Sequence, residues 1–162
     1  MKKFKLLTGL SVASILVFVA TGCKKDNNNG GGAGISATIN GAAWQSQPIW
    51  TSANHSGGTT TVAGGYIKSG DSTAITIAIH DSVHVGEPDK FYLSDLLYIR
   101  SNGGSEKIYG SGGPGHGTLT LTTRDQNAHR IAGTFSGVFY NGQLDDSVKI
   151  DNGQFNLTYK EN

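Results

Sequence analysis

The densest group of side chains that could ligate a metal is His80-Asp81-Ser82-Val83-His84. On an extended strand His80, Ser82 and His84 share one face, because successive side chains alternate. Neutral imidazoles are common zinc ligands, so His80 and His84, joined by an acid from elsewhere, predict a candidate metal site that could activate water for hydrolysis. The alternative interpretation is two exposed histidines flanking a turn that Asp81 and Ser82 begin.

Other patterns associated with catalysis are missing or stand in the wrong context. The chain contains no Gly-x-Ser-x-Gly nucleophile motif. Residues 110–115 satisfy Gly-x-Gly-x-x-Gly, but the alternating segment 117–121 behind them predicts a strand, whereas a dinucleotide site needs a helix there. We interpret residues 110–115 as a flexible loop. The sequence therefore predicts no catalytic residue, no cofactor and a domain that is not an enzyme.

The adjacent acids Asp145 and Asp146 do not form the carboxylate pair of a glycosidase, since neighbours on a strand face opposite sides. We interpret them as a solvated turn. Together with Asp151 and Asn152 they could alternatively supply oxygen ligands to calcium.

Aromatic side chains give the best sequence argument for ligand binding. Flat rings stack on the faces of sugars, and a glycan-binding β domain would present at least two exposed aromatics on one concave face. Tryptophan in a short chain is more often a core residue, because it buries a large apolar area. A structural subunit with an open sheet edge is a further hypothesis. The candidate ligand-binding residues are Trp44, Trp50, Tyr66, Tyr92 and Tyr98.

The elements that must position these residues are strands. From residue 35 onward apolar side chains recur with period two, as in residues 73–80, 118–123 and 155–159. No stretch has the period and length of a helix. Residues 35–162 are therefore expected to form a single all-β domain, an antiparallel β-sandwich or flattened barrel of about eight to ten strands.

Turn signals separate these strands. Asn-Gly is the strongest short hairpin signal, because both residues tolerate positive φ. It occurs at residues 40–41, 102–103, 141–142 and 152–153. Glycine-containing turns are also expected at residues 56–58, 69–71 and 86–89.

The first residues have the pattern of an export signal. Three lysines lie within residues 1–5, residues 6–20 are almost entirely apolar, and small residues lead to Cys23. The apolar run is shorter than the roughly 20 residues of a membrane-spanning helix, so residues 1–22 are predicted to be a signal peptide. Residues 20–23 resemble a bacterial lipobox, which implies lipidation of Cys23. The alternative is an ordinary secretory signal with an incidental cysteine.

Residues 23–34 are polar and glycine-rich and are expected to be a flexible tether behind the lipidated cysteine. Because each buried acyl CH₂ contributes about 0.8 kcal/mol, lipid on Cys23 would hold the protein on a membrane. The expected location is the outer membrane or cell surface, with the periplasmic face as an alternative. A glycan or another envelope protein is the expected partner.

Charge and cysteine content exclude other classes of function. The whole chain has 13 basic and 12 acidic residues, and removal of the three N-terminal lysines leaves 10 basic against 12 acidic. The chain shows no basic patch, so nucleic-acid binding is not expected. Cys23 is the only cysteine, which excludes an intramolecular disulfide and a cysteine-based zinc site.

Three motifs resemble a family of small Bacteroidota lipoproteins with a β-rich domain of unassigned function. They are an Asn-Gly-x-x-Trp start in residues 39–44, a Gly-Thr-Phe segment in 133–137 and an Asn-Gly-x-Phe end in 150–155. The likeness covers most of residues 35–160. It implies a β-rich fold and an envelope location, and it carries no catalytic residues over to this chain.

A second resemblance concerns modification. Three Asp-Ser triplets, at residues 71–73, 81–83 and 146–148, resemble the O-glycosylation acceptor of Bacteroidota. The resemblance implies sugar-bearing surface positions at Ser72, Ser82 and Ser147.

Overall fold

The computed structural model describes residues 33–91, 94–112 and 116–162, and these form an all-β domain, as predicted. Twelve strands are described, two of which have only two residues each, so the longer ones match the expected eight to ten. A single turn of 3-10 helix, η1 (Pro48–Trp50), stands between β2 and β3. The strands are β1 (Gly34–Ile39), β2 (Ala42–Gln45), β3 (Thr51–Ser56), β4 (Thr59–Lys68), β5 (Asp71–His80), β6 (Pro88–Asp89), β7 (Ser94–Asn102), β8 (Ser105–Gly110), β9 (His116–Asp125), β10 (Arg130–Asn141), β11 (Ser147–Thr158) and β12 (Lys160–Glu161).

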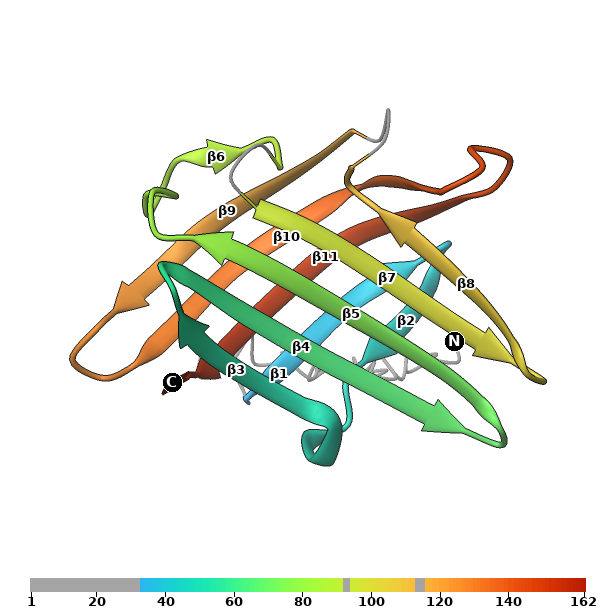
Figure 1. Cartoon of the computed structure of the whole chain (residues 1–162), viewed down its shortest axis with the longest axis horizontal. Coiled ribbons are helices and arrows are strands. Elements are labelled where there is room, and N and C mark those ends of the chain that lie inside the picture. The colour runs from blue at the N-terminus through green and yellow to red at the C-terminus, as the bar shows by residue number, and fades with distance from the viewer. Residues whose placement is uncertain (1–32, 92–93, 113–115) are drawn as a thin grey trace, which may run out of the picture. The chain divides into compact units, whose positions relative to one another are not determined.

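The strands form one curled sheet whose two halves face each other. In the order of pairing, β3, β4, β5, β7 and β8 make one layer, and β9, β10, β11, β1 and β2 make the other. Figure 1 shows the first layer in front of the second. The neighbours within each layer are antiparallel. This arrangement confirms the expected all-β fold, in which one curled sheet forms a half-barrel.

The two layers are joined at both sides. On one side β8 pairs with β10 through Tyr109 and Gly110. On the other side the chain leaves β11 at Thr158, and the short β12 pairs in parallel with β3. These two seams hold the layers as one unit around a shared core.

The core is made by the alternation that the sequence displays. Ile75, Ile77 and Ile79 on β5 are fully buried, and so are Leu119 and Leu121 on β9. Neighbouring residues on the same strands face outward. Burial of such side chains contributes roughly 1.5–3 kcal/mol each, which stabilises the close packing of the layers.

Two of the motifs that carry the family resemblance pack against each other in the second layer. Gly133 on β10 is the cross-strand partner of Phe155 on β11, and Phe135 is the partner of Gly153. A Cβ added at Gly133 would lie 2.7 Å from the Phe155 ring, and one at Gly153 would lie 2.6 Å from the Phe135 ring. Each phenylalanine therefore covers the glycine opposite it, and the motifs are structural.

The Asn-Gly pairs do not all make hairpin turns. Asn40 and Gly41 have φ of 48° and 83° and join β1 to β2, as predicted. After β7 the two positive-φ residues are Gly103 and Gly104, one position later than expected. After β10 the pair at 141–142 opens a longer loop that ends at Asp146.

The fourth Asn-Gly pair lies inside a strand, so its interpretation as a hairpin is wrong. Asn152 has φ of 51° within β11. The pairing of β11 shifts register beside it, both against β10 and against β1. Positive φ at asparagine serves a β-bulge as well as a turn, which explains the difference.

The predicted signal peptide, Cys23 and most of the tether lie outside the described residues. Within the described part of the chain, no helix is long and apolar enough to cross a membrane.

Candidate binding site

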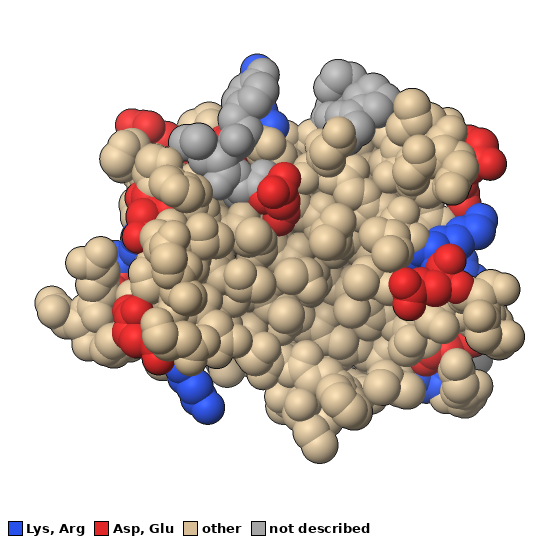
Figure 2. All heavy atoms as spheres, in the orientation of Figure 1, with Lys and Arg blue, Asp and Glu red and all other residues tan. Residues whose placement is uncertain are grey.

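The outer face of the first layer is broad and nearly uncharged. Cross-strand pairing places Gly65, Ala74, Ile99 and Ile108 in one row across β4, β5, β7 and β8. These residues alternate with the buried core positions, so their side chains point away from the core. Figure 2 views this layer and shows a wide area without charged residues below its centre, with most charges gathered toward the edges.

Trp50 stands at one end of this row. The turn η1 holds it there, because the backbone N–H of Gln47 donates to the carbonyl of Gly65 at 2.8 Å. The Gln47 side chain also bonds both backbone groups of Ile67, at 3.2 Å and 3.3 Å. Gly65 leaves the space that the Trp50 side chain needs, since a Cβ there would lie 3.2 Å from the Trp50 Cβ. Trp50 is 54% exposed on this fixed turn.

A shallow groove of about 260 Å³ runs beside Trp50, and we call it the indole groove. Small residues, the aliphatic residues Ile67 and Ile99, and hydroxyl-bearing residues line it together with Trp50. None of the residues that line it is ionisable. They are Trp50, Ala63, Gly64, Gly65, Ile67, Ser72, Thr73, Ala74, Thr76 and Ile99.

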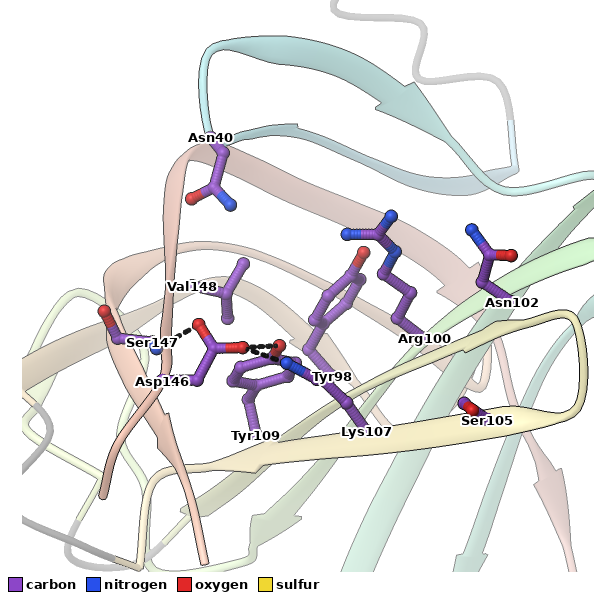
Figure 3. Close-up of a pocket in the computed structure, with 10 residues that line it drawn as sticks. All are labelled: Asn40, Tyr98, Arg100, Asn102, Ser105, Lys107, Tyr109, Asp146, Ser147 and Val148. Carbon is purple, nitrogen blue, oxygen red and sulfur yellow. Dashed lines mark hydrogen bonds and ion pairs between the residues drawn. The ribbon is translucent and has the colours of Figure 1, made fainter. Parts of the chain in front are cut away.

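A second cavity, the polar pocket, has a volume of about 300 Å³ and a different chemistry. It opens between the β7–β8 hairpin, the β1–β2 turn and the start of β11 (Figure 3). Tyr98 and Tyr109 lie with their rings 5.8 Å apart and are 95% buried. The residues that line it are Asn40, Tyr98, Arg100, Asn102, Ser105, Lys107, Tyr109, Asp146, Ser147 and Val148.

Asp146 ties one side of the polar pocket together. Its Oδ2 accepts hydrogen bonds from Lys107 Nζ at 2.6 Å and from the Tyr109 hydroxyl at 2.9 Å. Its Oδ1 accepts from the backbone N–H of Ser147 at 2.9 Å. The interpretation of Asp146 as part of a solvated turn therefore misses its role, because its partners lie 37 and 39 residues away in the sequence.

These contacts fix the protonation states in the polar pocket. Hydrogen bonds from Lys107 and then Tyr109 hold the pKa of Asp146 below its ordinary value. The same carboxylate raises the pKa of Lys107. Burial, followed by the bond to Asp146, raises the pKa of Tyr109, and burial raises the pKa of Tyr98. At neutral pH Asp146 and Lys107 are charged, and both tyrosines keep their hydroxyl protons.

His80 and His84 do not meet a third metal ligand in the described residues. Both side chains are exposed, and His80 Nδ1 lies 2.7 Å from the hydroxyl of Ser82. The described chain holds no group of three or more histidine, cysteine or acidic side chains arranged to bind a metal. The interpretation as two exposed histidines beside a turn describes this segment.

The segment from His80 to Val83 binds a positively charged side chain instead of a metal. The Arg124 guanidinium on β9 donates to the carbonyls of His80, Asp81 and Val83, at 3.1, 2.6 and 3.0 Å. The contact links the end of β5 in one layer to β9 in the other. The spacing of the histidines gave no sign of it, because the partner lies 41 to 44 residues further along the chain.

Two other histidines lie beside acids at the end of the barrel where β12 closes it. His55 Nε2 lies 3.7 Å from Asp81 Oδ2 and 4.0 Å from Glu161 Oε2. His129 Nδ1 lies 3.6 Å from Glu161 Oε1, and both rings pack against Tyr159. These contacts attach β12 to its neighbours.

The four predicted aromatic residues that the structure describes are not brought together. Trp44 is half-buried against the core, and its Nε1 donates to Thr73 Oγ1 at 2.7 Å. Tyr66 is half-buried on β4, Tyr98 lines the polar pocket, and Tyr92 lies outside the described residues. Trp50 is the one exposed aromatic among the described residues, so the expected face with two exposed rings is not found there.

The three serines of the acceptor-like triplets lie at strand ends and turns. Ser82 and Ser147 are exposed, whereas Ser72 at the start of β5 is half-buried. Ser72 lines the indole groove and Ser147 lines the polar pocket.

Comparison with known proteins found no protein similar to this chain. It matches no protein-family model, no curated protein and no solved structure.

Proposed function

We propose that this chain is a lipid-anchored envelope protein whose β domain binds saccharides without catalysing a reaction. The observation that carries this proposal is Trp50, a single ring that stands 54% exposed beside the indole groove, where two exposed rings were expected. Trp50 belongs to a larger apolar surface, since Ile67, which is 45% exposed, lines the same groove, and a contiguous exposed apolar patch marks a contact surface. The bonds of Gln47 to Gly65 and Ile67 support a preformed site, since they hold the ring in place before any ligand arrives.

The chemistry of the indole groove supports a neutral sugar. One face of a pyranose ring carries only C–H groups, which pack on an indole, while its hydroxyls point sideways. The small residues Ala63, Gly65 and Ala74 leave room for such a ring, and Thr76 offers a hydroxyl at its edge. Because no ionisable residue lines the groove, no charged group of the protein has to lose its water when an uncharged ligand binds.

Replacement of Trp50 with alanine is expected to weaken saccharide binding at least about tenfold, since loss of the ring removes about 1.5–3 kcal/mol of apolar contact. The measurement is retardation in gels that contain neutral polysaccharides built from glucose, mannose or N-acetylglucosamine. Leu144→Ala is the matched control, because Leu144 is also 54% exposed but does not line the groove.

The folded state should be the same in both variants, because an exposed side chain contributes little to stability. If Trp50→Ala keeps the retardation of the parent protein, or if none of these polysaccharides retards the parent, the proposed function is wrong.

Membrane attachment through Cys23 completes the proposal. The lysines, apolar run and lipobox-like residues before Cys23 support it. Cys23→Ser is expected to move the exported protein from the membrane fraction to the soluble fraction, because no acyl chain can then be attached. Immunoblots of fractionated cells measure this. Recovery of Cys23→Ser in the membrane fraction at the parent level would contradict the anchor.

A further inference from the structure

The polar pocket lies on the other side of β7 from the indole groove. Tyr98 and Arg100 line the pocket, whereas Ile99 between them borders the groove. Successive residues of a strand point to opposite faces, so one strand serves both cavities independently. A neutral sugar bound in the indole groove would not contact the polar pocket. The pocket is lined by charged and hydrogen-bonding residues that the groove lacks.

Hydrogen-bond donors without partners dominate the polar pocket. The Arg100 guanidinium forms no hydrogen bond or ion pair with any described residue, so none of its five N–H groups has a partner in that part of the chain. Figure 3 shows the Tyr98 hydroxyl pointing toward the same end of the cavity as the Arg100 guanidinium. The Asn40 side-chain oxygen accepts a hydrogen bond from the backbone N–H of Lys149 at 2.8 Å, which leaves the two N–H groups of the amide to donate to a ligand.

The carboxylate of the polar pocket is already used. Asp146 is the only carboxylate that lines it, and its two oxygens accept three hydrogen bonds from Lys107, Tyr109 and the Ser147 backbone. Lys107 and Asp146 neutralise each other, so the positive charge of Arg100 has no compensating negative charge among the lining residues. The lining side chains therefore carry one net positive charge and an excess of donors.

We propose that the polar pocket binds a small carboxylate, which the Arg100 guanidinium holds through two parallel hydrogen bonds. The planar fork of arginine matches the two oxygens of a carboxylate. The Tyr98 hydroxyl and the Asn40 amide are placed to donate to neighbouring oxygens of the same ligand. At about 300 Å³ the cavity fits an acid of about one sugar ring, either a free acid or the acidic end of a glycan.

A monoanion fits better than a phosphate. One uncompensated cation balances one ligand charge, and Lys107 is held by Asp146 at 2.6 Å. The network also keeps the site in shape before binding, since Asp146 fixes Lys107 and Tyr109, and the two tyrosine rings pack on each other. A polyhydroxylated acid such as a uronate would use both the cation and the surrounding donors.

The test is titration of the isotope-labelled mature protein with sodium glucuronate, glucose, acetate and inorganic phosphate, followed by NMR. Glucuronate is expected to give saturable shifts at Tyr98, Arg100 and Asn102, and glucose none there. Arg100→Gln should weaken glucuronate binding about tenfold or more, because it removes the charge and the paired donors. A glucuronate-terminated oligosaccharide distinguishes a glycan end from a free acid.

Arg130→Gln is the control, because Arg130 on β10 bonds Asn156 and does not line the pocket. Equal binding of glucose and glucuronate, tighter binding of phosphate, or full glucuronate affinity in Arg100→Gln would each overturn the proposal. So would the absence of shifts in the pocket with every carboxylate. None of these results bears on Trp50, whose saccharide retention is measured separately.

Discussion

Gly153→Ala is expected to lower the free energy of unfolding by about 2–4 kcal/mol. The new Cβ would lie 2.5 Å from the carbonyl oxygen of Phe135 and 2.6 Å from its ring. The oxygen belongs to the backbone of the neighbouring strand, so it cannot move without disturbing the pairing of β10 with β11. The Phe135 ring cannot move freely either, since it is 97% buried.

Chemical denaturation at fixed pH measures this effect, with Gly142→Ala as the control. Gly142 lies in the loop after β10, and an added Cβ there meets nothing within 4 Å. Its replacement should change the free energy of unfolding by no more than about 0.5 kcal/mol. Gly133→Ala should resemble Gly153→Ala, because its Cβ would lie 2.7 Å from both the Phe155 ring and the Thr120 carbonyl. Equal midpoints for Gly153→Ala and Gly142→Ala would refute the reciprocal packing.

The strands were predictable from the sequence because their signal is local. Ile75, Ile77 and Ile79 alternate with small and polar residues, and the structure buries all three. The pairing of the two Gly-x-Phe segments was not predictable, because it depends on the register of β10 against β11. That register is set in part by the bulge near Asn152, which looks like a hairpin signal in the sequence.

The candidate sites were predictable only in part. Trp44 and Trp50 are six positions apart and look alike in the sequence. Their difference comes from long-range contacts: Trp44 bonds Thr73, whereas Trp50 sits on a turn that Gln47 attaches to β4. The sequence predicts no site at the polar pocket, although three of its lining residues, Tyr98, Asp146 and Ser147, are candidates for other roles. Its walls come together only when β7 and β8 meet the loop before β11, so no local pattern reveals it.

The segment with two histidines shows the same limitation. Its local spacing suggested a metal, but the positive group that its backbone meets is Arg124 on a distant strand. Three carbonyls of one turn converge on a single guanidinium. A hydrogen bond to a charged group contributes about 1.5–3 kcal/mol net of the water contacts it replaces, and less where it is exposed, as two of these three are. This contact therefore fastens the end of β5 to β9.

Arg124→Met is expected to lower the free energy of unfolding by about 2–3 kcal/mol, because methionine keeps an apolar stem and donates no hydrogen bond to the three carbonyls. Arg130→Met is the control, since Arg130 bonds a single side chain and is exposed. Thermal unfolding of both variants at one protein concentration measures the difference. Arg124→Lys should recover only part of the loss, because one ammonium cannot reach three carbonyls in the geometry of a fork.

Hydrogen exchange separates a local clamp from a general loss of stability. In Arg124→Met the amides of Val83 and Gly86 should exchange faster, because their bonds to His80 and Leu121 depend on the same turn. The amide of Ile77, deep in β5, should exchange faster only as far as the global stability falls. Uniform acceleration along all of β5, with no excess at Val83 and Gly86, would show that Arg124 acts on the whole barrel. The segment from His80 to Val83 would then not be held by its contact with Arg124 in particular.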